Sequence, residues 1–200
     1  MKIKYFLLLI FIFGLTACPN PVDTDVSVKS FKINGVVITK SDPYEYSDIQ
    51  SNKAIDWDKF TINFDFETKT ETKSIAALLS ITNNAYATYD GVRVSPEIEN
   101  IQIWSNNDYN ETYPLGTELY NLFSAWNCET EVGARLEELL NTMIYWTHES
   151  KAGRWDLCKG HLTLKESPID DFEGKFYVEL KFEDGSILQD STQTVTITSK

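Results

Sequence analysis

The sequence predicts a mainly β protein with a minor α component, an antiparallel β-sandwich-like domain with one helical excursion at about residues 130–147. The main evidence is two segments in which apolar and polar residues alternate, because this period places one face of a strand on a core and the other in water. The apolar positions are Phe60, Ile62, Phe64 and Phe66 in the first segment and Phe176, Val178, Leu180 and Phe182 in the second. Strands with one polar face are typical of antiparallel sheets.

The composition fits one globular domain with a core. Of the 200 residues, 42% are hydrophobic and 24% are charged, which excludes collagen-like, low-complexity and wholly disordered proteins. The 18 basic and 30 acidic residues give a net charge of −12. No nucleic-acid partner is expected, because phosphate contacts need clustered lysine and arginine.

The first residues predict an export signal. Lys2 and Lys4 precede an apolar run over residues 5–13, which is shorter than the about 20 residues that span a bilayer as a helix. Leu15-Thr16-Ala17-Cys18 then resembles the bacterial lipobox. We expect residues 1–17 to be a lipoprotein signal peptide, residues 18–26 a lipidated tether and residues 27–200 a single β-rich domain. The alternative is a simple signal peptide with an incidental cysteine.

This interpretation makes Cys18 the site of lipid attachment and the membrane the first partner. Stable anchoring takes two acyl chains, and a triacylated cysteine exceeds that requirement. Pro19 stands where an aspartate would indicate retention in the inner membrane, so the outer membrane is expected. The periplasmic and external faces both remain open.

The remaining strands are expected from weaker signals. Candidate strands cover residues 26–33, 35–39, 98–104 and 161–165. Asp184 and Gly185 are typical of a hairpin turn, and Val195 and Ile197 alternate with threonines in a closing strand. Residues 74–87 are apolar without a clean period, so helix and buried coil both remain open.

The helical excursion has its own pattern. Between residues 130 and 146 the apolar positions are spaced for one helical face, at Val132, Leu136, Leu139, Leu140, Met143 and Ile144. Thr130 is the expected N-cap, and Glu131 favours the positive end of the helix dipole.

Cys128 and Cys158 flank this helix and form an even pair once Cys18 carries lipid. A disulfide is expected in an oxidising compartment. Free thiols and a metal or nucleophilic role are the alternatives, although no CxxC or HxxxH spacing accompanies these cysteines.

No metal site, cofactor or catalytic residue is predicted. Asn106, Asp108 and Asn110 have the first spacings of an EF-hand loop, but Glu111 replaces the required glycine and Thr117 the final glutamate. Asparagine and aspartate that cap their own turns are the alternative explanation. The carboxylate pairs are Asp56 with Asp58, Glu137 with Glu138 and Asp170 with Asp171, and neither they nor His148 and His161 form a catalytic motif.

Tyrosines gather in polar, turn-like segments. They are Tyr44, Tyr46, Tyr86, Tyr89, Tyr109 and Tyr113, and Trp155 has a similar setting. Exposed rings of this kind bind sugars or proteins, so Asn106, Asp108, Tyr109, Asn110 and Tyr113 form a tentative ligand-binding loop. The alternative is that the rings cover the ends of a sandwich.

The mid-chain and C-terminal segments carry a resemblance. Residues 101–110 are followed by Tyr113-Pro114-Leu115-Gly116-Thr117, by Leu119, Leu122 and Phe123, and at the end of the chain by Asp184-Gly185 and a threonine-rich strand. Together with the lipobox, this order resembles an uncharacterised family of small Gram-negative lipoproteins. The resemblance implies an envelope location and a β-rich fold, and it brings no catalytic residues.

The expected function is a membrane-anchored envelope lipoprotein that acts as a non-enzymatic binding or structural module. One alternative is an accessory subunit of an outer-membrane complex that handles glycans, with an envelope protein or a glycan as partner. The other alternative is a hydrolase whose residues meet only in the folded chain.

Overall fold

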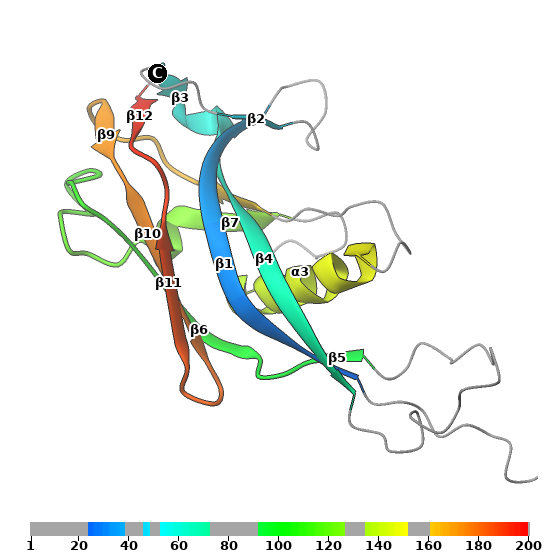
Figure 1. Ribbon diagram of the computed structural model, residues 1–200. Helices are drawn as coiled ribbons and strands as arrows, with labels where there is room; N and C mark the ends of the chain where they lie inside the picture. Colours follow the sequence, from blue (N-terminus) through cyan, green and yellow to red (C-terminus); the bar gives the residue numbers. More distant parts are fainter. Residues whose placement is uncertain are drawn as a thin grey trace, which may run out of the picture.

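A computed structural model describes residues 24–38, 46–48, 53–72, 92–126, 135–151 and 161–199. It confirms a mainly β, sandwich-like fold with one long helix (Figure 1). The largest sheet has the order β2-β1-β4-β8-β7. Its strands are β1 (Thr24–Ile38), β2 (Tyr46–Asp48), β4 (Phe60–Thr72), β7 (Phe123–Trp126) and β8 (His161–Leu164). One further strand, β5 (Val92–Val94), pairs in parallel with the first residues of β1.

Two smaller sheets complete the fold. The first has the order β11-β10-β6, with β6 (Ile98–Ser105), β10 (Phe176–Phe182) and β11 (Ile187–Ser191). The second has the order β3-β12-β9, with β3 (Ile55–Asp56), β9 (Phe172–Gly174) and β12 (Val195–Thr198). Two 3-10 turns, η1 (Trp57–Lys59) and η2 (Tyr120–Leu122), precede β4 and β7.

The core lies between the large sheet and the β11-β10-β6 sheet. The predicted alternation of apolar and polar residues is confirmed in β4 and β10. The apolar positions of β4 and β10 are all buried. Phe176 of β10 is a centre of this core, with its ring centroid 5.4 Å from Phe60, 5.1 Å from Phe172 and 5.5 Å from Phe123. Burial of each such side chain contributes about 1.5–3 kcal/mol. The cluster joins four strands, β4 and β7 of the large sheet, β9 and β10, and so connects all three sheets.

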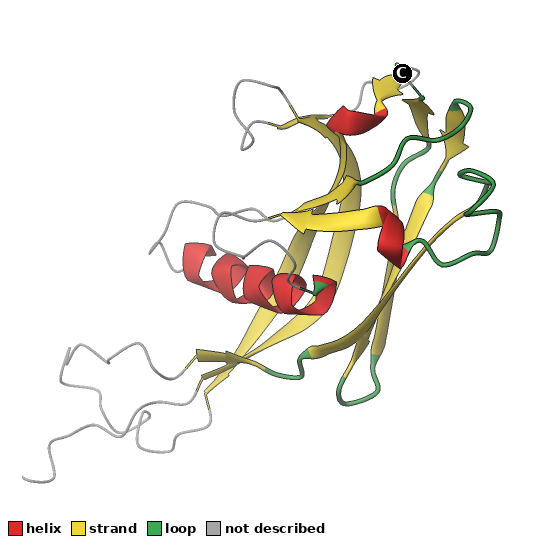
Figure 2. Cartoon of the chain, turned by 180° about the vertical axis from the view of Figure 1, so that it is seen from behind, coloured by secondary structure: helices red, strands yellow, loops and turns green. Residues whose placement is uncertain are grey.

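Helix α3 (Leu136–Lys151) packs against β4 and β6, which belong to different sheets (Figure 2). The predicted apolar face is confirmed for the described residues, because Leu136, Leu139, Leu140, Met143 and Ile144 are buried. The start of the helix differs from the prediction. Arg135 precedes the helix, so Thr130 is not its N-cap, and His148 lies within the helix rather than after it.

A tertiary contact accounts for this later start. The hydroxyl of Tyr120 accepts a hydrogen bond from the Leu136 N–H (3.3 Å) and donates one to the Glu137 carboxylate (3.0 Å). The first turn of a helix leaves backbone N–H groups without an intrahelical partner. Tyr120 of η2 therefore caps α3 from a different part of the chain.

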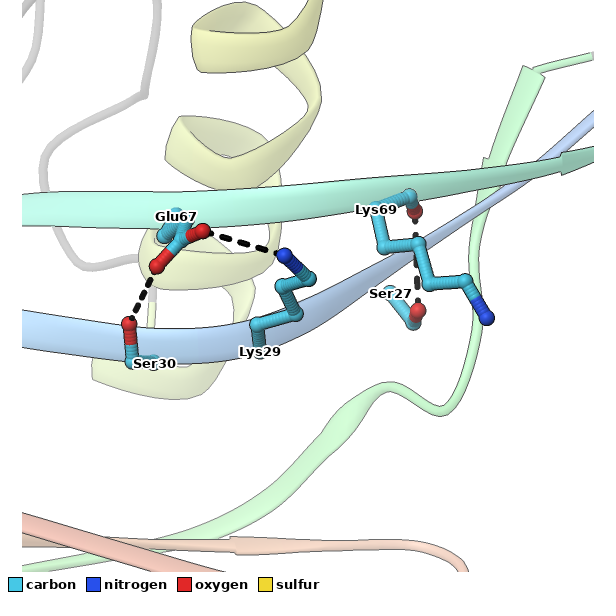
Figure 3. A network of polar contacts seen from close by, with 5 residues as sticks. All are labelled: Ser27, Lys29, Ser30, Glu67 and Lys69. Carbon is cyan, nitrogen blue, oxygen red and sulfur yellow. Dashed lines mark hydrogen bonds and ion pairs between the residues drawn. The ribbon is translucent and has the colours of Figure 1, made fainter.

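Strand β1 is continuous over two segments that the sequence suggested separately, and it contains a bulge. The register with β4 shifts between Val28 and Ser30. On the outer face, Lys29 forms an ion pair with Glu67 (3.1 Å), and the Ser30 hydroxyl donates to the same carboxylate (3.0 Å; Figure 3). The extra residue keeps Val26 and Phe31 on the same buried face, although they are an odd number of residues apart.

The start of β1 also shortens the predicted tether. Residues 24–26 pair with β4 and β5, and Val26 is fully buried, so these three residues belong to the folded sheet rather than to a tether. Within the described part of the chain, none of the helices is long and apolar enough to cross a membrane.

Candidate binding cleft

The predicted ligand-binding loop is a turn that its own side chains hold together. The Asp108 carboxylate accepts the Leu115 N–H (2.6 Å), and the Asn110 side-chain oxygen accepts the N–H groups of Thr112 and Tyr113 (2.9 Å each). The Asn106 side-chain oxygen accepts the Lys175 N–H (2.7 Å) and so ties the turn to β10. The alternative explanation of turn capping is thus confirmed for Asp108 and Asn110.

Tyr109 is not an exposed aromatic platform, and this part of the prediction is wrong. The ring is 3% exposed and lies 5.5 Å from Phe172 and 6.3 Å from Phe176. Its hydroxyl donates to the Glu166 carbonyl (2.7 Å). Burial holds the pKa of Tyr109 well above its usual range. Tyr113 is half-buried against the core, so the two rings do not form a joint ligand surface.

A cleft lies elsewhere in the molecule. It has a volume of about 410 Å³ and lies between the first residues of β1 and the β10–β11 hairpin. Figures 1 and 2 show β1 and this hairpin diverging towards one end of the molecule. Asp25, Ser27 and Val28 of β1 form one wall, together with Glu71 of β4. Phe182, Asp184 and Ser186 of the hairpin form the other wall.

The cleft ends where side chains of β11 and of the connection from β11 to β12 take the place of a strand partner for β1. The Asp190 carboxylate accepts the Ile33 N–H (2.8 Å). The Gln193 side chain accepts the Gly35 N–H (3.2 Å) and donates to the Gly35 carbonyl (2.8 Å), as a neighbouring strand would. We call these three bonds the seam.

The connector between β5 and β6 forms the floor of the cleft. The Ser95 N–H donates to the Val26 carbonyl (2.9 Å), which attaches the connector to β1. The Glu183 N–H donates to the Glu97 carbonyl (3.0 Å), which attaches it to the hairpin. Ser95 and Pro96 lie between these two bonds and line the cleft, so both walls are fixed relative to each other.

The charge of the cleft is negative. Its described lining residues include three carboxylates, Asp25, Glu71 and Asp184, and neither lysine nor arginine. Two cations lie close by, because Lys69 pairs with Glu71 (2.5 Å), and Arg93, which is opposite Asp25 in register, approaches Glu97 (4.0 Å). Hydrogen bonds from Ser186 hold the pKa of Asp184 below its usual range. Among the described residues, the lining and Glu97 contribute four carboxylates, and Lys69 and Arg93 lie beside them.

The carboxylate pairs and the histidine considered in the sequence lie in different surroundings. Glu137 is buried beside Tyr120 and Arg135, whereas Glu138 is exposed, and Asp170 and Asp171 are exposed in a turn. His161 is buried in β8, which pairs with β4 and β7. Among the described residues, no group of three or more histidine, cysteine, aspartate or glutamate side chains is arranged to hold a metal ion.

Several predicted sites lie outside the described residues. They are Cys18, Cys128, Cys158, Thr130, Glu131, Tyr44, Tyr86, Tyr89 and Trp155. The cleft itself had no signal in the sequence, because its described lining comes from four separate stretches of the chain. Comparison with known proteins finds no matching family model, no matching curated protein and no matching solved structure.

Proposed function

We propose that this protein is a lipid-anchored lipoprotein of the outer membrane that acts as a non-enzymatic binding module, and that its cleft takes a positively charged ligand. The observation that carries the proposal is the position of the acidic cleft beside the first strand. Asp25 lines the cleft and is seven positions after the lipobox cysteine Cys18. At about 3.5 Å per extended residue, the lipid would hold the cleft within about 25 Å of the membrane surface.

The absence of paired catalytic groups supports binding rather than turnover. The carboxylates of the cleft lie on solvent-accessible walls, and the described part of the chain has neither a histidine nor a nucleophile of a recognised motif beside them. General acid–base chemistry requires neighbouring groups with separated pKa values. An open, acidic, rigidly framed cleft instead fits reversible capture of a cation.

Anchoring is tested by expressing the full chain in a Gram-negative host with radiolabelled palmitate. We expect the wild type to carry the label and to sediment with the outer membrane, and Cys18→Ser to lose both properties. Cys158→Ser is the matched control and keeps the label. An unlabelled wild-type protein would contradict the anchoring part of the proposal.

Ligand charge is tested by calorimetry on the lipidated protein in non-ionic detergent, with spermidine as the probe. We expect binding that Asp25→Asn combined with Glu71→Gln weakens about tenfold, the effect of losing two charge contacts. The control is Glu111→Gln combined with Glu118→Gln, which removes two exposed carboxylates from the turn that does not line the cleft. Equal weakening by both double variants would contradict a specific cation site.

A further inference from the structure

We propose that the outer face of the β11-β10-β6 sheet binds a neutral glycan, with one sugar ring stacked on Tyr177 and its hydroxyl groups bonded to the polar side chains beside it. The inference goes beyond the proposed function, because none of the residues that carry it belongs to the described lining of the acidic cleft. It rests on the side chains that three neighbouring strands place on one surface.

The outer face of this sheet is turned away from β1, β4 and α3 (Figures 1 and 2). Inward positions such as Ile103 and Val178 are fully buried, so the residues that alternate with them point outward. The register aligns these outward residues in rows across the strands. One row consists of Trp104 in β6, Tyr177 in β10 and Ser191 in β11.

Tyr177 uses only one face of its ring within this row. Its ring and the ring of Trp104 are parallel to within 9°, with centroids 5.7 Å apart, and both residues are half-buried. Stacking occupies the face of Tyr177 that is turned towards β6. On the other side its neighbour is Ser191, whose side chain is too short to cover a ring. The face of Tyr177 above β11 can therefore receive a second flat, apolar surface.

A row of hydrogen-bonding side chains lies directly beside the aromatic row. It consists of Gln102, Glu179 and Gln189, which are also aligned in register. Within the described part of the chain, these three side chains form no hydrogen bond or ion pair, so two amides and one carboxylate offer donors and acceptors to a ligand. Rows are about 7 Å apart and neighbouring strands about 5 Å. A ring stacked on Tyr177 therefore has its rim within reach of Glu179 and Gln189.

A sugar ring matches this arrangement. A pyranose ring with equatorial hydroxyl groups presents axial C–H groups to an aromatic ring, and the hydroxyl groups around its rim both donate and accept hydrogen bonds. The charges favour a neutral ligand, because Lys181 on the same face is paired with Glu99 (2.7 Å) and a carboxylate such as Glu179 accepts hydroxyl donors. The apolar part of the two rows is one aromatic pair, which suits a sugar ring rather than the about 800 Å² that a stable protein interface buries on each partner.

The test uses the lipidated full chain in a polyoxyethylene detergent, because alkyl glycoside detergents would themselves present sugar rings. Cellotetraose and chitotetraose are the probes, since both are neutral chains of pyranose rings with equatorial hydroxyl groups. Sorbitol, which has hydroxyl groups but no ring, is the control ligand. Calorimetry gives the affinity at low and at high salt, and thermal unfolding of each variant shows that it is folded.

We expect a tetrasaccharide to bind, sorbitol not to bind, and salt to leave the affinity unchanged because the ligand is neutral. Tyr177→Ala weakens binding about tenfold, whereas Tyr177→Phe keeps the ring and binds like the wild type. Gln189→Ala weakens binding about fivefold through the loss of one hydrogen bond. The matched control is Ile187→Ala, an exposed residue of the same strand outside the two rows, which leaves the affinity unchanged.

Binding of neither tetrasaccharide would overturn the inference, and so would a Tyr177→Ala variant that binds as tightly as the wild type. Sorbitol binding of equal strength would show that hydroxyl groups suffice without a stacked ring, which also overturns it. The cation site is tested separately, because spermidine binding depends on Asp25 and Glu71 and is expected to be the same in Tyr177→Ala as in the wild type. Loss of sugar binding with retained spermidine binding in the wild type would therefore reject this inference alone.

Discussion

At Tyr109 a single hydroxyl fixes a polar turn to the core. The ring packs on Phe172 and Phe176, and the hydroxyl reaches the Glu166 carbonyl at 2.7 Å. A buried hydrogen bond contributes about 0.5–1.5 kcal/mol, and an acceptor left without its partner costs about 1–3 kcal/mol. The turn that carries Asp108 and Asn110 is therefore held from inside the core as well as by its own caps.

Tyr109→Phe tests this contact because it keeps the ring and removes the donor. We expect the free energy of unfolding to fall by about 1–2 kcal/mol, measured by urea denaturation. The control is Tyr113→Phe in the same turn, whose hydroxyl has no hydrogen-bond partner within the described part of the chain. Equal losses in the two variants would show that the hydroxyl of Tyr109 has no special role.

Tyr109 also predicts how stability depends on alkaline pH. Burial raises the pKa of its phenol in the folded state, so folding favours the neutral form. Below about pH 10, the usual pKa of tyrosine, both states are neutral and this stability is fully present. As pH rises further the unfolded state ionises first, and the free energy of unfolding falls. We expect a smaller alkaline decrease in Tyr109→Phe than in the wild type. If the free energy of unfolding falls equally with pH in the two proteins, the raised pKa of Tyr109 is not the cause of the alkaline decrease.

At the scale of elements, the seam joins two sheets through side chains rather than through a ladder. Gln193→Ala removes both bonds to Gly35 and leaves a partly buried backbone pair to be satisfied by water. We expect a loss of about 1 kcal/mol and faster amide exchange at Gly35. Gln189→Ala is the matched control, because Gln189 is an exposed residue of β11 outside the seam. Unchanged exchange at Gly35 in Gln193→Ala would show that the seam is not held by this side chain.

The N-terminal end of α3 is a second contact between distant elements. Tyr120→Phe removes the acceptor of the Leu136 N–H and the donor to Glu137. Since Glu137 is 6% exposed, we expect a loss of about 1–3 kcal/mol and weaker exchange protection over the first turn of α3. Glu138→Gln, an exposed neighbour on the same turn, is the control and changes stability little. A stability of Tyr120→Phe equal to that of the wild type would contradict the capping role.

Elements were predictable from the sequence where a local pattern coincides with burial. β4 and β10 alternate strictly, and all their apolar positions are buried. β1 gave a weaker signal, because the bulge between Val28 and Ser30 interrupts the alternation. Strands such as β3 and β9, of two and three residues, exist only through pairing with β12. The start of α3 depends on Tyr120, which no pattern within the helix reveals.

At the scale of the whole molecule, the candidate site was beyond sequence reasoning. Residues 106–113 were predicted to bind a ligand because tyrosine, asparagine and aspartate gather there. In the structure, the same residue types form a turn that is capped by its own side chains and whose Tyr109 is buried. The cleft joins Asp25, Glu71 and Asp184, which are far apart in the sequence and individually ordinary. What the composition did indicate was the sign of the charge, because a chain with a net charge of −12 presents carboxylates on most surfaces.

That net charge leads to a prediction for the stability of the whole domain. Excess charge of one sign destabilises a compact state through self-repulsion. Opposing this, Lys29–Glu67, Lys69–Glu71 and Lys181–Glu99 are ion pairs whose side chains are 46–59% exposed, and such pairs contribute about 0–1 kcal/mol each. Salt screens both effects as the Debye length falls from about 30 Å at 0.01 M to about 10 Å at 0.1 M.

Because the repulsion extends over the whole chain and these three ion pairs are exposed, we expect screening of the repulsion to dominate. The Tm should rise by about 2–4 °C between 0.01 and 0.2 M sodium chloride, with choline chloride giving the same rise if the effect is screening alone. Near the isoelectric point of about 4.6, the repulsion is absent and the rise should disappear. A Tm that falls with salt at neutral pH would show instead that the exposed ion pairs outweigh the net charge.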